Sequence, residues 1–265
     1  MIFILKEIQK LTAAIFILIL INSHLFAQQK YDFPQFGDET ADFLSRPVKW
    51  NLTDWAILGG LGSISYLLMH VDENVRTEML KDRSYVKSVP MVFGTYYGEP
   101  ITPAILGGLF LAHGIAKDNR ANKKLGFEIL QSYVYSVAVT GLIKFSFGRA
   151  RPLTGSNAFS FYPYSFKNPD YLSFSSGHTA IAFAMSTVFY NNVDSDILKA
   201  ISYLPAFITG FSRMYHNKHW ASDVFMGAAV GYFVAKFAVD QHKRKDVLTE
   251  TGVPSTPVIS IQMAF

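Results

Sequence analysis

One apolar segment near the end of the chain, residues 221–239, reads ASDVFMGAAVGYFVAKFAV. Its apolar residues do not alternate with polar ones, and it is too long for a typical strand, so we expect a helix. Gly227, Gly231 and Ala235 place a small residue at every fourth position of this helix. Such a stripe lets two helices approach closely, either in a membrane bundle or in the tight core of any all-helical protein. The segment therefore predicts a helix packed closely against another helix.

Five earlier segments share the apolar character of this one and are also too long for typical strands: residues 55–70, 101–116, 126–147, 177–193 and 200–211. Because none of them shows strand-like alternation, we predict an all-α fold, a bundle of about six core helices that is associated with a membrane.

The sequence also predicts four successive parts of the chain. An export signal at 1–27 has lysines before an apolar core and Ala27 at a plausible cleavage point, although it can also remain as an uncleaved anchor. A polar N-terminal extension at 28–54 follows, in which Pro34 and Pro47 are expected to interrupt any helix. The remaining two parts are the helical domain at 55–242 and an extended or disordered C-terminal tail at 243–265.

Composition narrows the classes of protein that the chain can belong to. The charged fraction of 17% is below the usual level of roughly 25%, and a mean hydropathy of +0.19 lies between soluble helical and polytopic membrane proteins. The net charge of +4 suits an anionic ligand or lipid headgroups, but no basic stripe or zinc-finger pattern indicates a nucleic-acid partner. The absence of cysteine excludes disulfides, thiolate chemistry and cysteine-ligated metals.

The lengths of the predicted helices bear on whether they cross a membrane. A span needs about 20 apolar residues, whereas 55–70 and 101–116 reach only about 24 Å. The loop 117–124 and residues 242–245 are basic, as cytoplasmic loops tend to be. A cleaved signal, three full crossings and an external loop after residue 147 are mutually inconsistent. Either one segment enters the bilayer part-way or the bundle is a soluble periplasmic domain, and we favour membrane association.

Three polar stretches stand at the ends of predicted helices: KFSFGRARP at 144–152, SFSSGHTA at 173–180 and SRMYHNKHWASD at 212–223. Together they supply three cations, Lys144, Arg151 and Arg213, which suit one small, doubly charged anion. Ser176 and Gly177 open a helix, where unpaired N–H groups and the helix dipole favour an anion.

Two histidines complete this pattern. His219 and Asp223 are spaced i,i+4, which places them on one face if the helix begins at or before His219. The carboxylate can then hold Nδ1–H and leave Nε2 as a nucleophile. His178 can protonate the leaving oxygen. Phosphoryl transfer needs little beyond positioning and charge neutralisation, so we expect no metal and no cofactor.

Each of these residues also has an ordinary structural interpretation, as a helix cap, a dipole partner or a packing residue. The joint pattern is more specific, because S-R-x5-H-x3-D from Ser212 to Asp223 fixes four residues at about one in 10^5 per position. We therefore favour a phosphate site over four unrelated structural roles. His216 falls outside the pattern, and we expect it to be a surface or loop histidine.

At these residues the sequence resembles the type 2 phosphatidic acid phosphatase superfamily, which also includes vanadium haloperoxidases and bacterial class A acid phosphatases. The family pattern is K-x6-RP, PSGH and SR-x5-H-x3-D; it covers roughly residues 90 to 240, and the proline of PSGH is Ser175 here. The resemblance implies a phosphate held by Lys144, Arg151, Ser176, Gly177 and Arg213. It implies His178 as general acid, His219 as nucleophile and Asp223 as its orienter, with a phosphohistidine hydrolysed by water.

The leading interpretation is a metal-independent lipid phosphate or lipid pyrophosphate phosphatase of the bacterial inner membrane, with its site facing the periplasm. The alternatives are a soluble periplasmic acid phosphatase of broad specificity, a vanadate-dependent haloperoxidase and a non-enzymatic envelope protein with a decayed site. Vanadate is expected to occupy the phosphate site as an inhibitor, and neither the lipid substrate nor the oligomeric state follows from the sequence. Seven aromatic residues between the first two stretches either meet a membrane or acyl chain, or pack the loop onto the bundle: Phe159, Phe161, Tyr162, Tyr164, Phe166, Tyr171 and Phe174.

Overall fold

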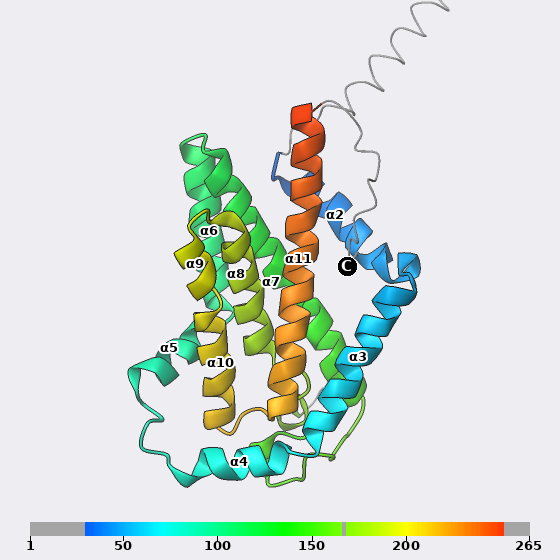
Figure 1. The fold of residues 1–265 in the computed structure, drawn as a ribbon, viewed down its shortest axis with the longest axis vertical. Helices are drawn as coiled ribbons and strands as arrows, with labels where there is room; N and C mark the ends of the chain where they lie inside the picture. Colours follow the sequence, from blue (N-terminus) through cyan, green and yellow to red (C-terminus); the bar gives the residue numbers. More distant parts are fainter. Residues whose placement is uncertain (1–29, 166–167, 252–265) are drawn as a thin grey trace, which may run out of the picture. The chain divides into compact units, whose positions relative to one another are not determined.

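The computed structural model describes residues 30–165 and 168–251, so the predicted export signal and the last part of the tail lie outside the described residues (Figure 1). Within the described part the chain is helical, and its one β feature is an isolated bridge between Arg149 and Phe161. The prediction of an all-α fold is therefore confirmed.

All six predicted segments form helices: α3 (Leu52–Met69), α6 (Ile101–Ala116), α7 (Arg120–Phe147), α8 (Gly177–Asn192), α10 (Leu204–Tyr215) and α11 (Ala221–Thr251). Further helices lie before and between them: α2 (Phe33–Ser45), α4 (Asp72–Lys81), α5 (Val89–Tyr97) and α9 (Asp196–Ile201). Three short 3-10 helices complete the described structure: η1 (Arg46–Lys49), η2 (Pro152–Thr154) and η3 (Pro169–Tyr171). Residues 31–239 form one compact unit; a second unit contains residues 240–251, the last turns of α11, together with Lys30.

Two segments that were expected to be irregular are helical. Pro34 does not interrupt a helix but occupies the first turn of α2, where a missing N–H costs nothing, and the Asp32 side chain caps that turn. Phe43 of α2 stacks on Tyr135 of α7 at a ring separation of 4.3 Å, which holds α2 on the bundle. Residues 243–251, expected to be extended, continue α11.

The small-residue stripe of α11 makes the close contact that its spacing predicts. A Cβ atom at Gly227 would collide with the carbonyl group of Ser176, and one at Gly231 would collide with that of Ala180. The start of α8 therefore lies directly against α11. Around this contact, α7, α8 and α11 share a buried core of Ile129, Ala184, Met185, Val188, Ala235 and Val239.

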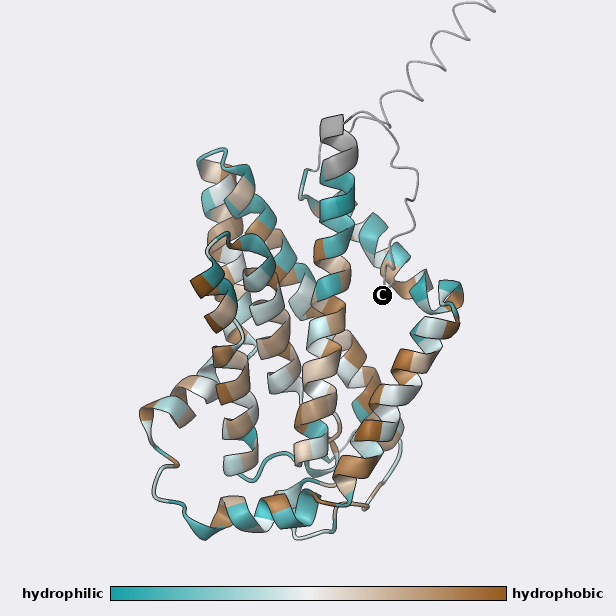
Figure 2. Cartoon of the chain, in the orientation of Figure 1, coloured by the Kyte–Doolittle hydropathy of each residue, from teal (hydrophilic) through white to brown (hydrophobic). Residues whose placement is uncertain are grey.

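Helix α3 differs from these core helices because most of its surface is not covered by protein. Only 17% of its 18 residues are buried, and hydrophobic residues recur along its length (Figure 2). By length and composition, α3 and residues Ala221–Asp246 of α11 are the two helices of the described chain that are long and apolar enough to cross a membrane. The apolar surface of α3 is the kind that lipid or another protein covers.

Candidate active site

The first polar stretch begins where α7 ends. Gly148 adopts the left-handed conformation at φ +56°, and its N–H binds the carbonyl of Lys144 at 2.9 Å, so the helix stops within one turn of the lysine. The Lys144 ammonium donates to the Leu172 carbonyl at 2.5 Å and to the Ser173 carbonyl at 3.4 Å. Lys144 is therefore held against the loop that leads into α8.

The two arginines of the predicted site are anchored close to His219. Arg151 donates from Nη1 to the Lys218 carbonyl at 3.3 Å and from Nε to the Pro169 carbonyl at 3.0 Å. Arg213 stands in the last turn of α10, and its carbonyl accepts from the Lys218 N–H at 3.0 Å. The Arg151 side chain and the Arg213 backbone therefore both contact Lys218, the residue before the histidine.

The second stretch forms the N-terminus of α8. Ser176 and Gly177, both predicted to bind phosphate, have different roles there. Ser176 is the N-cap: its hydroxyl is buried and accepts from Thr179 Oγ1 at 2.9 Å. That hydroxyl is engaged as a cap, so Ser176 contributes to an anion site by starting the helix. Gly177 lies beside Lys144, since a Cβ there would be 3.8 Å from the lysine Cε. The first-turn N–H groups, which have no intrahelical acceptor, thus lie next to the lysine.

The third stretch places His219 against Asp223. Nδ1 of His219 lies 3.5 Å from Asp223 Oδ2, so the ring's other nitrogen, Nε2, lies on the side away from the carboxylate. The same oxygen accepts from the Trp220 N–H at 2.9 Å and from the Ser173 hydroxyl at 2.5 Å. The predicted contact is therefore present, although α11 begins only at Ala221, so the turn before the helix and not a shared helix face brings the two side chains together. The Trp220 N–H and the Ser173 hydroxyl hold the carboxylate in place.

Arg149, which the sequence interpretation passed over, organises the base of the site. Its guanidinium is completely buried and donates to Asp223 Oδ1 at 2.7 Å and to Asp72 Oδ2 at 2.8 Å. Ser222 completes the network by accepting from Arg149 at 2.6 Å and by donating its N–H to Asp72 Oδ1 at 3.0 Å. One cation thus faces two buried carboxylates, and this network fixes the position of Asp223 beside His219.

Lys144, Arg151 and Arg213 lie close enough to repel one another, and burial together with this repulsion lowers the pKa of two of them. Burial and the charge of Arg151 lower the pKa of Lys144 to about 7. The same two causes lower the pKa of Arg213 to about 10. Burial lowers the pKa of His219 well below its usual value, against the hydrogen bond with Asp223, so the imidazole is neutral near pH 7. A doubly charged anion between the cations would relieve their mutual repulsion, and a neutral imidazole is the form that can act as a nucleophile.

His178, in the first turn of α8, has a partner that no sequence motif indicates. Its Nε2 lies 2.9 Å from Oε1 of Glu99, in the turn between α5 and α6. Asp72 and Glu99 both belong to the stretch between the first two apolar segments, in which the sequence interpretation placed no functional residue. No signal short of the folded structure indicates them, since each is an ordinary acidic residue in a polar loop or helix start.

The structure also places His216 and the aromatic residues between the first two polar stretches. His216 ends α10, where its Nδ1 lies 2.7 Å from the Ser212 carbonyl, which is a structural role. Of the aromatic residues, Phe174 and Phe161 pack beside Phe147, so this part of the loop covers the bundle. The exposed members are Phe159, Tyr162 and Tyr164, and Phe166 lies outside the described residues.

Among residues 30–165 and 168–251, no three His, Cys, Asp or Glu side chains gather as a metal site requires. The oxygen and nitrogen atoms nearest to His219 are committed to one another and to Arg149. The arrangement is that of a cation cluster for an anion.

A helical bundle with clustered cations and a carboxylate-held histidine defines a protein suited to bind a phosphate group. Residues 125–246, which include all three polar stretches, match the sequence profile of the PAP2 superfamily.

A lipid A 1-phosphatase from Porphyromonas gingivalis is 42% identical to the chain over 95 residues, which is 35% of the chain and 18% of that relative. The match therefore spans less than a fifth of the relative's length. The crystal structure of Aquifex aeolicus LpxE is similar with a TM-score of 0.47 and 22% identity, over 64% of this chain and 95% of that one.

Proposed function

We propose that the chain is a metal-independent phosphatase of lipid phosphates that passes the phosphoryl group through His219. The observation that carries this proposal is the buried pair of His219 and Asp223, 3.5 Å apart, beside the cations Lys144, Arg151 and Arg213. These are the parts that phosphoryl transfer needs: an activated nucleophile and charge that neutralises the equatorial oxygens.

The proposed reaction has two steps. In the first, Nε2 of His219 forms a bond to phosphorus while the ester P–O bond breaks, and the leaving oxygen takes a proton from His178. Asp223 holds the Nδ1 proton and, with the excess negative charge of the Asp72–Arg149–Asp223 network, stabilises the charged phosphohistidine. In the second step a water molecule attacks phosphorus, His178 takes its proton, and the P–N bond breaks to release phosphate.

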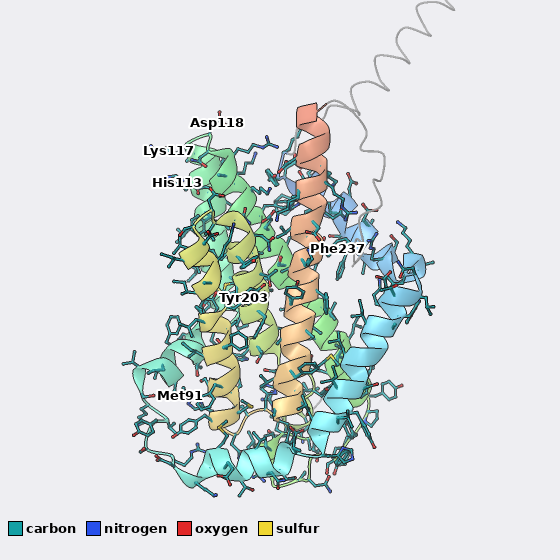
Figure 3. The ribbon with its side chains drawn as sticks, in the orientation of Figure 1. Met91, His113, Lys117, Asp118, Tyr203 and Phe237 are labelled. Atoms are coloured by element: carbon teal, nitrogen blue, oxygen red, sulfur yellow. The ribbon has the colours of Figure 1, made fainter. Side chains whose placement is uncertain are left out.

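Apolar features beside the site support a lipid substrate. A cavity of about 580 Å³ lies between α5, α8, α10 and α11. Its walls include Met214 and Val224, which adjoin Arg213 and Asp223 in sequence, and Met91, which Figure 3 shows on α5 beside α10. A cavity of this size and character suits an acyl chain whose phosphate reaches the cations.

Three observations support a membrane location and a lipid substrate. The exposed apolar length of α3 suits insertion in a membrane, and the N-terminal sequence has the pattern of an export signal. The Porphyromonas relative is a lipid A 1-phosphatase. We therefore propose an enzyme of the bacterial inner membrane whose site faces the periplasm and whose substrate is a phosphorylated lipid.

The test is phosphate release from a panel of phosphatidate, lipid A phosphates, a polyprenyl diphosphate and a soluble ester, with EDTA present. We expect hydrolysis of at least one lipid far above the soluble ester, and loss of activity in His219→Gln. A phosphoenzyme that is labile to acid and stable to base should be trapped by rapid quenching of the wild-type protein. Full activity of His219→Gln would refute the nucleophile, and preference for the soluble ester would refute the lipid substrate.

A further inference from the structure

The Glu99 carboxylate is placed beside His178 by backbone contacts. The Glu99 N–H binds the Tyr96 carbonyl at 3.1 Å, and the Glu99 carbonyl accepts from the Thr102 N–H at 3.0 Å, which fixes the turn between α5 and α6. A Cβ atom at the preceding residue, Gly98, would lie 2.7 Å from the His178 carbonyl oxygen. Glycine is therefore needed for this turn to approach the start of α8, and that approach brings Glu99 within 2.9 Å of Nε2.

The charged groups around His178 act on its pKa in opposite directions. Burial and the charges of Arg213 and Arg151 lower the pKa of His178, whereas the hydrogen bond and the charge of Glu99 act to raise it. Arg213 and Arg151 both disfavour an imidazolium at this position, and the Glu99 charge opposes them. Glu99 is thus the acidic group that favours the protonated ring, and by occupying Nε2 it leaves Nδ1 as the nitrogen that can give up a proton.

We propose that Glu99 is a positioning residue that orients His178 and favours its protonated form as general acid, and thereby adapts the site to phosphate monoesters with poor leaving groups. This inference rests on the proposed function. An alkyl or sugar alkoxide leaves only when its oxygen is protonated as the P–O bond breaks, so the His178 Nδ1 proton must go to that oxygen. A diphosphate releases a phosphate group that needs no such proton, and its second phosphate would bring negative charge towards the Glu99 carboxylate.

The Glu99→Gln variant removes the charge and keeps the shape. Steady-state rates would be measured against pH with dodecyl phosphate, p-nitrophenyl phosphate and a polyprenyl diphosphate. We expect kcat for dodecyl phosphate to fall about 10²-fold, because general acid catalysis contributes on that scale. The p-nitrophenyl ester, whose leaving group needs no proton, should lose less than about threefold, and the diphosphate should be unchanged or faster.

The pH profile supplies a readout that a purely structural role would not change. Loss of the carboxylate lowers the pKa of His178, so the alkaline limb for dodecyl phosphate should move to lower pH. Glu78→Gln is the matched control, since Glu78 is exposed and pairs with the nearby Lys81 at 2.6 Å. Thermal unfolding of each variant checks that the fold is retained.

The outcomes separate the two proposals. Equal loss of kcat with the dodecyl and p-nitrophenyl esters, or an unmoved alkaline limb, would overturn the role of Glu99 while leaving the proposed phosphatase intact. Absence of phosphate release by the wild-type protein from all three substrates would overturn the proposed function and this inference with it.

Discussion

Replacing Arg149 with methionine tests whether the buried network supports both the fold and the site. The substitution roughly preserves the length of the side chain and removes its charge and its donors. Asp72 and Asp223, both fully buried, then lose the guanidinium that lies 2.8 Å from one and 2.7 Å from the other. Because each carboxylate is closed off from water, the lost interaction cannot be replaced by solvation.

The magnitude follows from the remaining partners. Removing one member of a buried ion pair costs about 3–5 kcal/mol, because the other charge stays buried and uncompensated. Asp72 keeps the N–H of Ser222, and Asp223 keeps the N–H of Trp220, which places the expected loss near the lower end, about 3 kcal/mol. At roughly 2–4 °C per kcal/mol for a unit of this size, the melting temperature should fall by about 6–12 °C.

Thermal unfolding of the purified protein in one detergent, followed by circular dichroism, measures this loss. Arg83→Met is the control, since that side chain is exposed and packs over the Tyr215 ring. Adding Asp72→Asn to Arg149→Met should recover part of the stability, because one orphaned charge is removed. An Arg149→Met protein that melts within about 2 °C of the wild type would refute the reasoning that this network is a major support of the fold.

Three further predictions follow from the site and its packing. Gly227→Ala should destabilise the protein by about 1–3 kcal/mol in chemical unfolding, because its methyl group meets the Ser176 carbonyl, and an unchanged midpoint would contradict that contact. Lys144, with a pKa near 7, is charged below that pH and neutral above it, so sulfate affinity measured by calorimetry should weaken from pH 6 to pH 8. Lys144→Arg should flatten that dependence, and a flat wild-type profile would show that the lysine does not control anion binding. Ser173→Ala removes a hydrogen bond to Asp223 and should lower kcat by about tenfold at unchanged KM, whereas a change in KM alone would assign the serine to substrate binding.

The sequence predicted helices best where the hydrophobic pattern is continuous. The segment 101–116 matches α6 at both ends, and 177–193 matches α8 to within one residue. These helices are long and apolar, so local sequence is sufficient to indicate them. Helix α2 was missed because Pro34 reads as a breaker, although its position in the first turn makes it compatible with the helix.

The sequence by itself determined the all-α class and the small-residue stripe that lets α11 pack closely on another helix, because both depend on the pattern of residues along a helix. Its motif spacing also indicated the pair His219 and Asp223. Only the tertiary structure decided which groups surround that pair. Asp72 lies 77 residues from Arg149, and Glu99 lies 79 residues from His178, so neither contact leaves a local pattern. Helix packing closes the Asp72–Arg149 contact off from water and brings Glu99, which stays partly exposed, against His178, so tertiary contacts convert two ordinary acidic residues into partners of the site.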